Sequence, residues 1–186
     1  MAVDGRVPEA SGDGGPGGFA AVDVAYPVSG GARAAIVVAS GPDFAEVLAE
    51  QIAWLPEAVP YSPGQFFLRE LPALRAILAG AGALRLVVVD GYVDLDPDGR
   101  PGLGAHVHEE FAVPVIGVAK SFFRAATHAV PVRRGSSDRP LYITAAGIPL
   151  PEAVGLVMNM SGRFRLPDAL RRVDALARGT QSVAAR

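Results

Sequence analysis

The 186-residue sequence contains no cysteine and only one lysine, against sixteen arginines. Without cysteine the chain can form neither disulfides nor thiolate metal sites, so any bound metal must use carboxylate, imidazole, carbonyl or water ligands. A hard cation such as Mg²⁺ or Mn²⁺ fits that restriction. Because cationic positions in this chain generally carry arginine, the single lysine, Lys120, either marks a place that needs a compact ammonium or is a chance substitution at the end of a strand.

Long apolar runs are also absent. No run reaches the ~18 residues that suggest a membrane span, and the N-terminus lacks the basic and apolar pattern of a signal peptide. We therefore expect a soluble, cytoplasmic protein without a membrane partner. Half of the residues are hydrophobic and the net charge is −2, which indicates one globular domain with a sizeable core.

The mildly acidic balance argues against broad, nonspecific binding of nucleic acid but leaves room for a local basic groove. Two clusters of arginine could line such a groove or could be ordinary solvated faces. They comprise Arg163, Arg165, Arg171 and Arg172, and Arg133, Arg134 and Arg139.

Several common site motifs are missing. No Walker loop, dinucleotide-binding GxGxxG unit or GxSxG elbow occurs where a strand would support it. The loop DLDPDG at 94–99 resembles the start of a calcium loop, but the twelfth position, which needs Glu, is Ala105. His106 and His108 are two residues apart in an expected helix, so they face different sides and form a poor chelating pair.

Along the chain, strands that pair locally and then alternate with helices predict a mixed sheet with helices on its faces. We expect a disordered, Gly- and Pro-rich tail over 1–18, one domain over 19–178 and a flexible C-terminal tail over 179–186. Segment 43–55 fits a helix or a strand. The expected strands are 19–27 and 32–40 as a hairpin, 84–90, 114–120, and 130–135 with 139–145 as a second hairpin; the expected helices are 66–82, 103–111, 151–160 and 167–178.

Charged residues fall where the expected buried strands end. LRLVVVD ends on Asp90 and PVIGVAK ends on Lys120. Further carboxylates lie inside the first strand (Asp23), in the first helix (Glu70) and in the last helix (Asp174). Asp23 could also be an exposed residue of an alternating strand. Convergent carboxylates are what phosphoryl-transfer enzymes use to hold two hard cations around a phosphate.

Five segments resemble the endonuclease V family in their order and approximate spacing, from about Phe19 to Arg178. These are DVAYP, PYSPG followed by an Arg-Glu pair, VVVDG, PVIGVAKS and RLPxxxRxxD. The resemblance implies an RNase H-like α/β fold, with a mixed five-stranded sheet flanked by helices, and implies that 43–55 is largely a third antiparallel strand. It also implies hydrolysis of a phosphodiester near a deaminated purine (inosine) in DNA or RNA, with Mg²⁺ or Mn²⁺, in nucleic-acid repair or turnover.

The resemblance assigns roles to the acidic residues and the lysine. Asp23, Glu70 and Asp90 take the positions of the metal-binding carboxylates, and Asp174 the position of an Asp or His near the second metal. Lys120 takes the place of a lysine beside the scissile phosphate. All five are therefore expected to be catalytic, and the four carboxylates are expected to bind metal.

The same resemblance implies which residues bind the substrate. Tyr61, Pro63 and Gly64 belong to a segment that resembles the family's wedge, in which Tyr61 would insert at the lesion and help to expel the base. Gly64 and Gly91 would bring backbone close to that base. Where the family has His-Pro-Arg after the Asp-Gly pair, this chain has YVDLDPDGRPGLGAH, and the family's Gly-His is here Ala146-Gly147. These departures concern the substrate side more than the metals.

Two alternatives remain open at the level of sequence. The protein could bind a modified nucleic acid without cutting it, although repulsion makes a retained cluster of carboxylates unfavourable for a pure binder. It could instead act on a small phosphorylated or nucleotide metabolite, in which case Tyr61→Ala should spare activity. The sequence leaves DNA or RNA open, and we expect a monomer.

Overall fold

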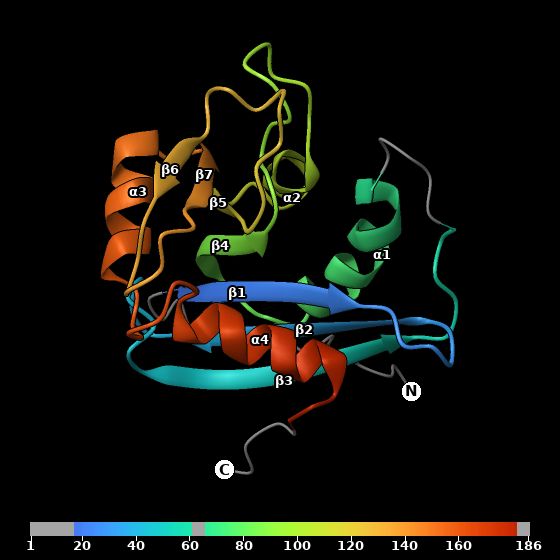
Figure 1. Cartoon of the computed structure of the whole chain (residues 1–186). Coiled ribbons are helices and arrows are strands. Elements are labelled where there is room, and N and C mark those ends of the chain that lie inside the picture. Colours follow the sequence, from blue (N-terminus) through green and yellow to red (C-terminus); the bar gives the residue numbers. More distant parts are fainter. Residues whose placement is uncertain (1–16, 61–65, 182–186) are drawn as a thin grey trace, which may run out of the picture.

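Seven strands form one mixed sheet in the part of the chain that the structure describes, residues 17–60 and 66–181 (Figure 1). In this computed structural model the strand order is β3-β2-β1-β4-β5-β7-β6. The strands are β1 (Gly18–Ala25), β2 (Ala32–Ala39), β3 (Val47–Leu55), β4 (Leu84–Asp90), β5 (Val115–Ala119), β6 (Val130–Val132) and β7 (Leu141–Ala146). The helices are α1 (Phe66–Leu78), α2 (Leu103–Phe111), α3 (Leu150–Asn159) and α4 (Asp168–Arg178).

The pairing of the strands confirms the predicted mixed sheet and corrects its size. Strands β1, β4 and β5 are parallel, and the outer strands are antiparallel to their neighbours. The ambiguous segment becomes strand β3, because pairing along β2 satisfies its backbone groups. The sheet has seven strands rather than five because the hairpin of β6 and β7 joins it, through β7 alongside β5.

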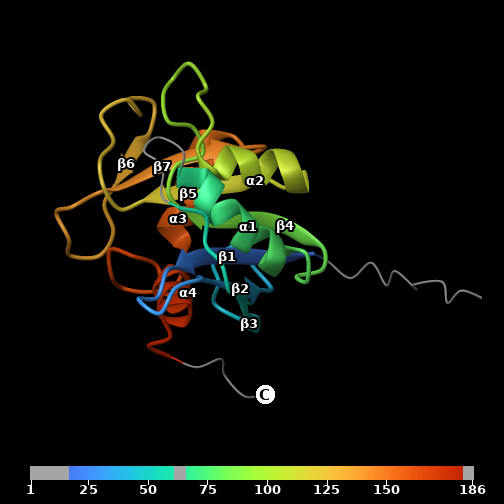
Figure 2. The same ribbon diagram turned by 90° about the vertical axis from the view of Figure 1, so that its right-hand side faces the viewer.

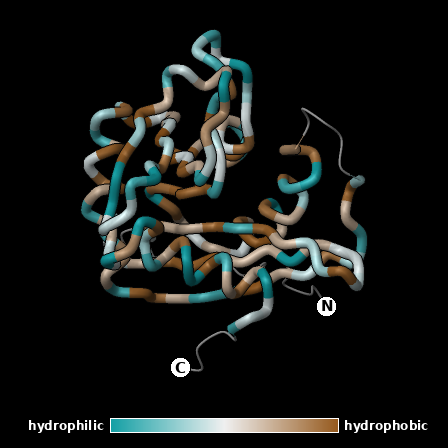
Figure 3. Tube along the Cα trace, viewed as in Figure 1, coloured by the Kyte–Doolittle hydropathy of each residue, from teal (hydrophilic) through white to brown (hydrophobic). Residues whose placement is uncertain are grey.

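Helices cover both faces of the sheet, α1 and α2 on one and α3 and α4 on the other (Figures 1 and 2). Neighbouring residues of a strand point to opposite faces, so Ala21 and Val88 pack under α3 and α4 whereas Val22 and Val89 pack under α1 and α2. Strands buried on both faces need nearly continuous apolar sequence. Figure 3 accordingly shows hydrophobic residues along the central strands, whereas the loop after β4 is largely hydrophilic.

The ends of the domain differ slightly from the sequence boundaries. β1 begins at Gly18, the last residue of the segment expected to be a tail, where its backbone pairs with Leu84. At the other end Gly179 caps α4 with a positive φ of 73°, a conformation that glycine adopts without strain. Within the described residues no helix has the length and apolar character needed to cross a membrane.

Gly117 on β5 supports the loop that follows β4. A Cβ at this position would lie 2.6 Å from the Gly91 carbonyl oxygen and 2.6 Å from Thr144 Oγ1, which accepts a hydrogen bond from the Val93 N–H. We therefore expect Gly117→Ala to lower the free energy of unfolding by about 1–3 kcal/mol, the usual cost of overpacking. Urea unfolding measures this change.

The matched control is Gly155→Ala on α3, where an added Cβ meets nothing within 4 Å. Because alanine is the better helix former, this substitution should leave stability unchanged or raise it by up to about 1 kcal/mol. Equal unfolding midpoints for Gly117→Ala and the wild type would show that the backbone around Gly91 yields without cost.

Candidate active site

Three charged side chains lie at the sheet edge toward which the parallel strands β1, β4 and β5 run. Asp23 is near the end of β1, Asp90 is the last residue of β4, and Lys120 directly follows β5. Each lies two residues beyond a member of the apolar layer under α3 and α4. Because strand residues alternate between faces, all three side chains are directed to the face that α4 covers.

Helix α4 brings a third carboxylate to this edge. One carboxylate oxygen from each of Asp23, Asp90 and Asp174 lies within 4.8 Å of the others. The Lys120 ammonium pairs with the Asp90 carboxylate and lies 3.6 Å from Asp174 Oδ1. Arg178, one turn further along α4, places its Nε 3.0 Å from Asp174. Two cations thus neutralise part of the charge of three clustered aspartates.

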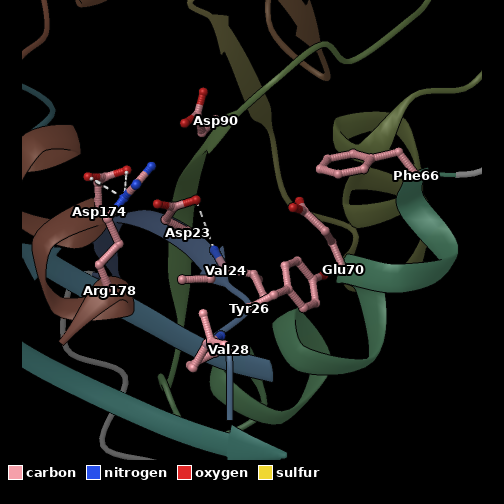
Figure 4. A pocket seen from close by; sticks show the side chains of 11 residues that line it. Asp23, Val24, Tyr26, Val28, Phe66, Glu70, Asp90, Asp174 and Arg178 are labelled. Carbon is pink, nitrogen blue, oxygen red and sulfur yellow. Dashed lines mark hydrogen bonds and ion pairs between the residues drawn. The ribbon is translucent and has the colours of Figure 1, made fainter. Parts of the chain in front are cut away.

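Glu70 approaches this cluster from α1, which packs on the opposite face of the sheet. Its side chain is directed across a cavity toward Asp23 and Asp90, and Figure 4 shows the arrangement. Only 7% of Glu70 is exposed. Burial, followed by the charges of Asp23 and Asp90, raises its pKa to about 9. The neighbouring Arg69 guanidinium stacks over the Tyr26 ring at 3.6 Å and opposes this shift.

The pKa values of Asp23 and of the neighbouring Lys120 are also shifted. Burial and the adjacent Asp90 raise the pKa of Asp23 to about 7, while Lys120 and the Val24 N–H, which donates to Asp23 Oδ1 at 2.9 Å, oppose the change. Burial lowers the pKa of Lys120, but its hydrogen bond to Asp90 and the charges of Asp90, Asp174 and Asp23 raise it above the ordinary value overall. The lysine therefore stays cationic at neutral pH.

These carboxylates fit a divalent cation. Asp23 and Glu70 are held where burial and like charge disfavour ionisation, and a bound cation would remove that penalty. Carboxylate oxygens are the ligands that Mg²⁺ and Mn²⁺ prefer. Among the described residues no other group of three or more acidic or histidine side chains converges in this way.

Two cavities meet at Asp90 and Phe66. One, of about 570 Å³, contains all four carboxylates together with Tyr26 and Arg178. The other, of about 530 Å³, has a mainly apolar lining and lies beyond Gly91. Its lining includes Phe66, Phe67, Gly91, Tyr92, Leu95, Leu103 and Phe123. A reacting group at the acidic cluster would therefore adjoin a pocket large enough for a planar apolar ring.

The structure describes only one of the four predicted substrate-binding residues. Tyr61, Pro63 and Gly64 lie outside the described residues, so their roles stay predictions. Gly91 lines the apolar cavity, and its contact with the base stays a prediction. Its φ of 145° is one that other residues rarely adopt, which gives a conformational reason for glycine at the point where the chain leaves β4.

One arginine from each of the two clusters supports the fold rather than a basic groove. Arg134 is buried and donates to carbonyl oxygens of the loop between α3 and α4, including those of Met160 and Phe164. Arg165 donates to the Lys120 and Pro140 carbonyls, so it braces the end of β5. These two guanidiniums are occupied by main chain. The structural use of arginine explains part of the composition bias.

Two neighbours of the cluster were missed by sequence reasoning. Arg178 had a usable signal, since it stands four residues after Asp174 in a predicted helix, the spacing at which opposite charges pair. Tyr92 had none. Its hydroxyl donates to the Ser121 carbonyl at 2.8 Å and accepts from the Phe123 N–H at 3.1 Å, partners about thirty residues away. Only the parallel pairing of β4 and β5 brings these segments together.

Glu70→Gln separates the chemical role of Glu70 from its structural one. Because the buried carboxyl is neutral at neutral pH in the absence of a cation, an isosteric amide should leave the melting temperature in EDTA unchanged or raised. Loss of the anionic ligand should lower metal-dependent turnover by about 100-fold or more. Differential scanning fluorimetry and a turnover assay measure the two effects. Glu109→Gln, exposed on α2, is the control, and full activity of Glu70→Gln would remove Glu70 from the site.

Comparison with known proteins shows what this arrangement resembles. The sequence profile of the family described as Endonuclease V matches residues 9–138. Endonuclease V of Azotobacter vinelandii is 36% identical over 181 residues, a match that covers 86% of this chain and 81% of that protein.

Solved structures agree with the sequence comparison. The crystal structure of Endonuclease V from Streptomyces avermitilis matches with a TM-score of 0.72 and 27% identity, covering 88% of this chain and 81% of that one. Ciona intestinalis Endonuclease V (D234N), crystallised with a 23mer DNA containing an inosine followed by a ribo-adenosine, matches with a TM-score of 0.71 and 18% identity, over 88% and 84% of the two chains. At 18% identity the second match concerns the fold.

Proposed function

The chain belongs to the Endonuclease V family, and from this premise we propose that it is a metal-dependent endonuclease that hydrolyses a phosphodiester near a deaminated purine, inosine, in DNA or RNA. One observation carries the proposal: in a chain of this family, three aspartates and Lys120 meet within a few ångströms at the edge where the parallel strands end. The complex of a protein of this family with inosine-containing DNA supports the choice of substrate.

In this proposal Asp23, Glu70, Asp90 and Asp174 hold Mg²⁺ or Mn²⁺. Two cations held by these residues would supply a water activated for in-line attack and would neutralise charge on the phosphate, and the products would carry 3′-hydroxyl and 5′-phosphate ends. The chain itself contributes pre-oriented acidic ligands on β1, β4, α1 and α4, elements that pack on the same sheet. Such pre-orientation avoids reorganisation at the moment of reaction.

Lys120 adds a cation that is already in place. Its ammonium pairs with Asp90 and lies 3.6 Å from Asp174, so it faces the position that a phosphate must take between these carboxylates. It can donate a hydrogen bond to a non-bridging phosphate oxygen and so stabilise the charge that develops there. A compact, strongly hydrated ammonium suits this narrow space better than a guanidinium.

The apolar cavity beyond Gly91 gives the lesion base a place next to the scissile bond. It shares Asp90 with the acidic cavity and is lined by the aromatic rings of Phe67, Tyr92 and Phe123. A flipped purine would be desolvated there and read by nearby main-chain groups. The wedge residues Tyr61, Pro63 and Gly64, assigned by resemblance, would displace the base from its strand.

Cleavage of defined oligonucleotides tests the proposal. Labelled single- and double-stranded DNA and RNA, each with one inosine, are incubated with the protein and Mg²⁺ or Mn²⁺, beside the same strands carrying guanosine at that position. The proposal predicts one cut near inosine, dependent on the metal, and little cutting of the guanosine strands. Equal cutting of both sets, or no cutting with either metal, would contradict it.

A further inference from the structure

Two aromatic rings on the segment directly after Lys120 each pack against a tyrosine from another part of the chain. Phe122 packs against Tyr142 of β7 with ring centroids 5.6 Å apart, and Phe123 packs against Tyr92 at 6.1 Å. The Phe123 pair lines the apolar cavity. Phe122 lies outside it, with 63% of its surface exposed. An aromatic ring so exposed, two residues from Lys120, is not explained by packing.

The backbone around Phe122 is fixed rather than free to fold inward. The Tyr92 hydroxyl binds the Ser121 carbonyl and the Phe123 N–H, the groups that flank Phe122 on both sides. The ring also rests on Tyr142, whose strand pairs with β5 at Ala119. These contacts hold Phe122 in an exposed position. The segment is therefore already ordered, and binding a ligand there costs little further conformational entropy.

The charge of the segment that carries this ring favours a polyanion. The segment from Ser121 to Pro140 holds four arginines and one acidic residue, Asp138, in a chain whose net charge is −2. Of these arginines, Arg124, Arg133 and Arg139 are exposed. An apolar protein partner would meet Phe122 and the less exposed Phe123 (36%) among Ser, Arg, Ala and Thr, too little for the apolar centre of an interface. Exposed aromatic rings among arginines are typical of surfaces that bind single-stranded nucleic acid.

We propose that Phe122, backed by Tyr142, is a stacking platform for an unpaired base of the substrate strand next to the cleavage site. The proposal rests on the proposed function and narrows its substrate class to nucleic acid that is single-stranded, or unpaired beside the lesion. The Lys120 ammonium holds one phosphate of the strand, and the ring two residues beyond Lys120 receives a neighbouring base. Stacking on a π face tolerates any base, so the platform adds affinity without sequence preference.

Binding in EDTA tests the platform apart from cleavage. The probe is a fluorescein-labelled, single-stranded DNA of about 20 nucleotides with one inosine, and fluorescence anisotropy gives its Kd. We expect Phe122→Ala to weaken binding about 10-fold or more and Phe122→Trp to retain it. The matched control is Trp54→Ala, which removes another exposed aromatic ring (51% exposed), on edge strand β3, and should leave Kd unchanged. Melting temperatures confirm that the variants fold.

A scan of abasic sites locates the stacked base. Each nucleotide beside the inosine is replaced in turn by an abasic site. At one position Phe122→Ala should no longer weaken binding relative to the wild type, because no base remains to stack on the ring. Wild-type affinity for Phe122→Ala, an equal loss for Trp54→Ala, or no binding of the wild type to the single strand would overturn the platform. Cleavage of the same strand is scored separately, so binding through Phe122 without cutting would refute only the proposed function.

Discussion

Asp90→Asn is expected to lower metal-dependent cleavage at inosine by at least about 10³-fold while the protein remains folded. Asp90 contacts Lys120 and lies within reach of Asp23 and Asp174, so its charge holds the lysine and, in the proposed function, would hold a bound cation. Losing several kcal/mol of charge stabilisation in the transition state corresponds to a factor of this size. Single-turnover rates with excess enzyme measure it.

Although Asp90→Asn lowers activity, the stability of this variant should rise or stay unchanged. Asparagine keeps the shape of Asp90 but removes its repulsion of Asp23 and Glu70, whose pKa values it helps to raise. The melting temperature in EDTA should therefore be equal to or above that of the wild type. Asp98→Asn, in the exposed loop after β4, is the control and should cut normally. A rate for Asp90→Asn within about tenfold of the wild type would place the chemistry elsewhere.

Stabilisation by Mg²⁺ should increase with pH. The pKa values of Asp23 and Glu70 in the folded protein are about 7 and about 9, above the ordinary values of about 4 in an unfolded chain. The folded state thus binds protons more tightly, and in EDTA this stabilising contribution is complete below pH ~4 and is lost as pH rises toward ~9. A cation competes with those protons, so it binds more tightly as they leave.

The expected size of the effect makes it easy to measure. With Mg²⁺ at about 100 times its Kd at about pH 8.5, the gain is about 2.7 kcal/mol, or roughly 5–10 °C in Tm for a chain of this length. At about pH 6 the same concentration should give a markedly smaller shift. Glu70→Gln should reduce the dependence on pH. Equal Tm shifts at both pH values would mean that the cation binds groups other than these two acids.

The sequence predicted the architecture largely because local pattern and tertiary structure agree in this chain. Continuous β-branched runs such as 84–90 can be buried only between two layers, and the helical periods of 66–78 and 168–178 match the helices that cover the sheet. Segment 43–55 could not be assigned from its pattern, because an edge strand such as β3 is half exposed and lacks clear alternation. Pairing with β2, a tertiary contact, decides it.

For the site, the sequence was most informative where a charged residue stands in or at the end of a buried strand, an energetically unfavourable position. Asp90 at the end of a buried strand and Asp23 within one are unfavourable unless they serve a site, and both lie in the cluster. Glu70 contributes to the same cavity but stands outside the group of three aspartates, since α1 covers the other face. The anchoring of Phe122 by Tyr92 depends on the register of β4 and β5, which pattern alone does not encode.

A crystal structure with a bound cation locates the metal site independently of any activity. Crystals grown with Mn²⁺ and measured near the manganese absorption edge would reveal the ion by its anomalous signal. We expect a peak among the carboxylates of Asp23, Asp90 and Asp174, on the side that faces Glu70. Mn²⁺ bound elsewhere, with these side chains free of metal at saturating concentration, would contradict the assignment of this cluster as the catalytic metal site.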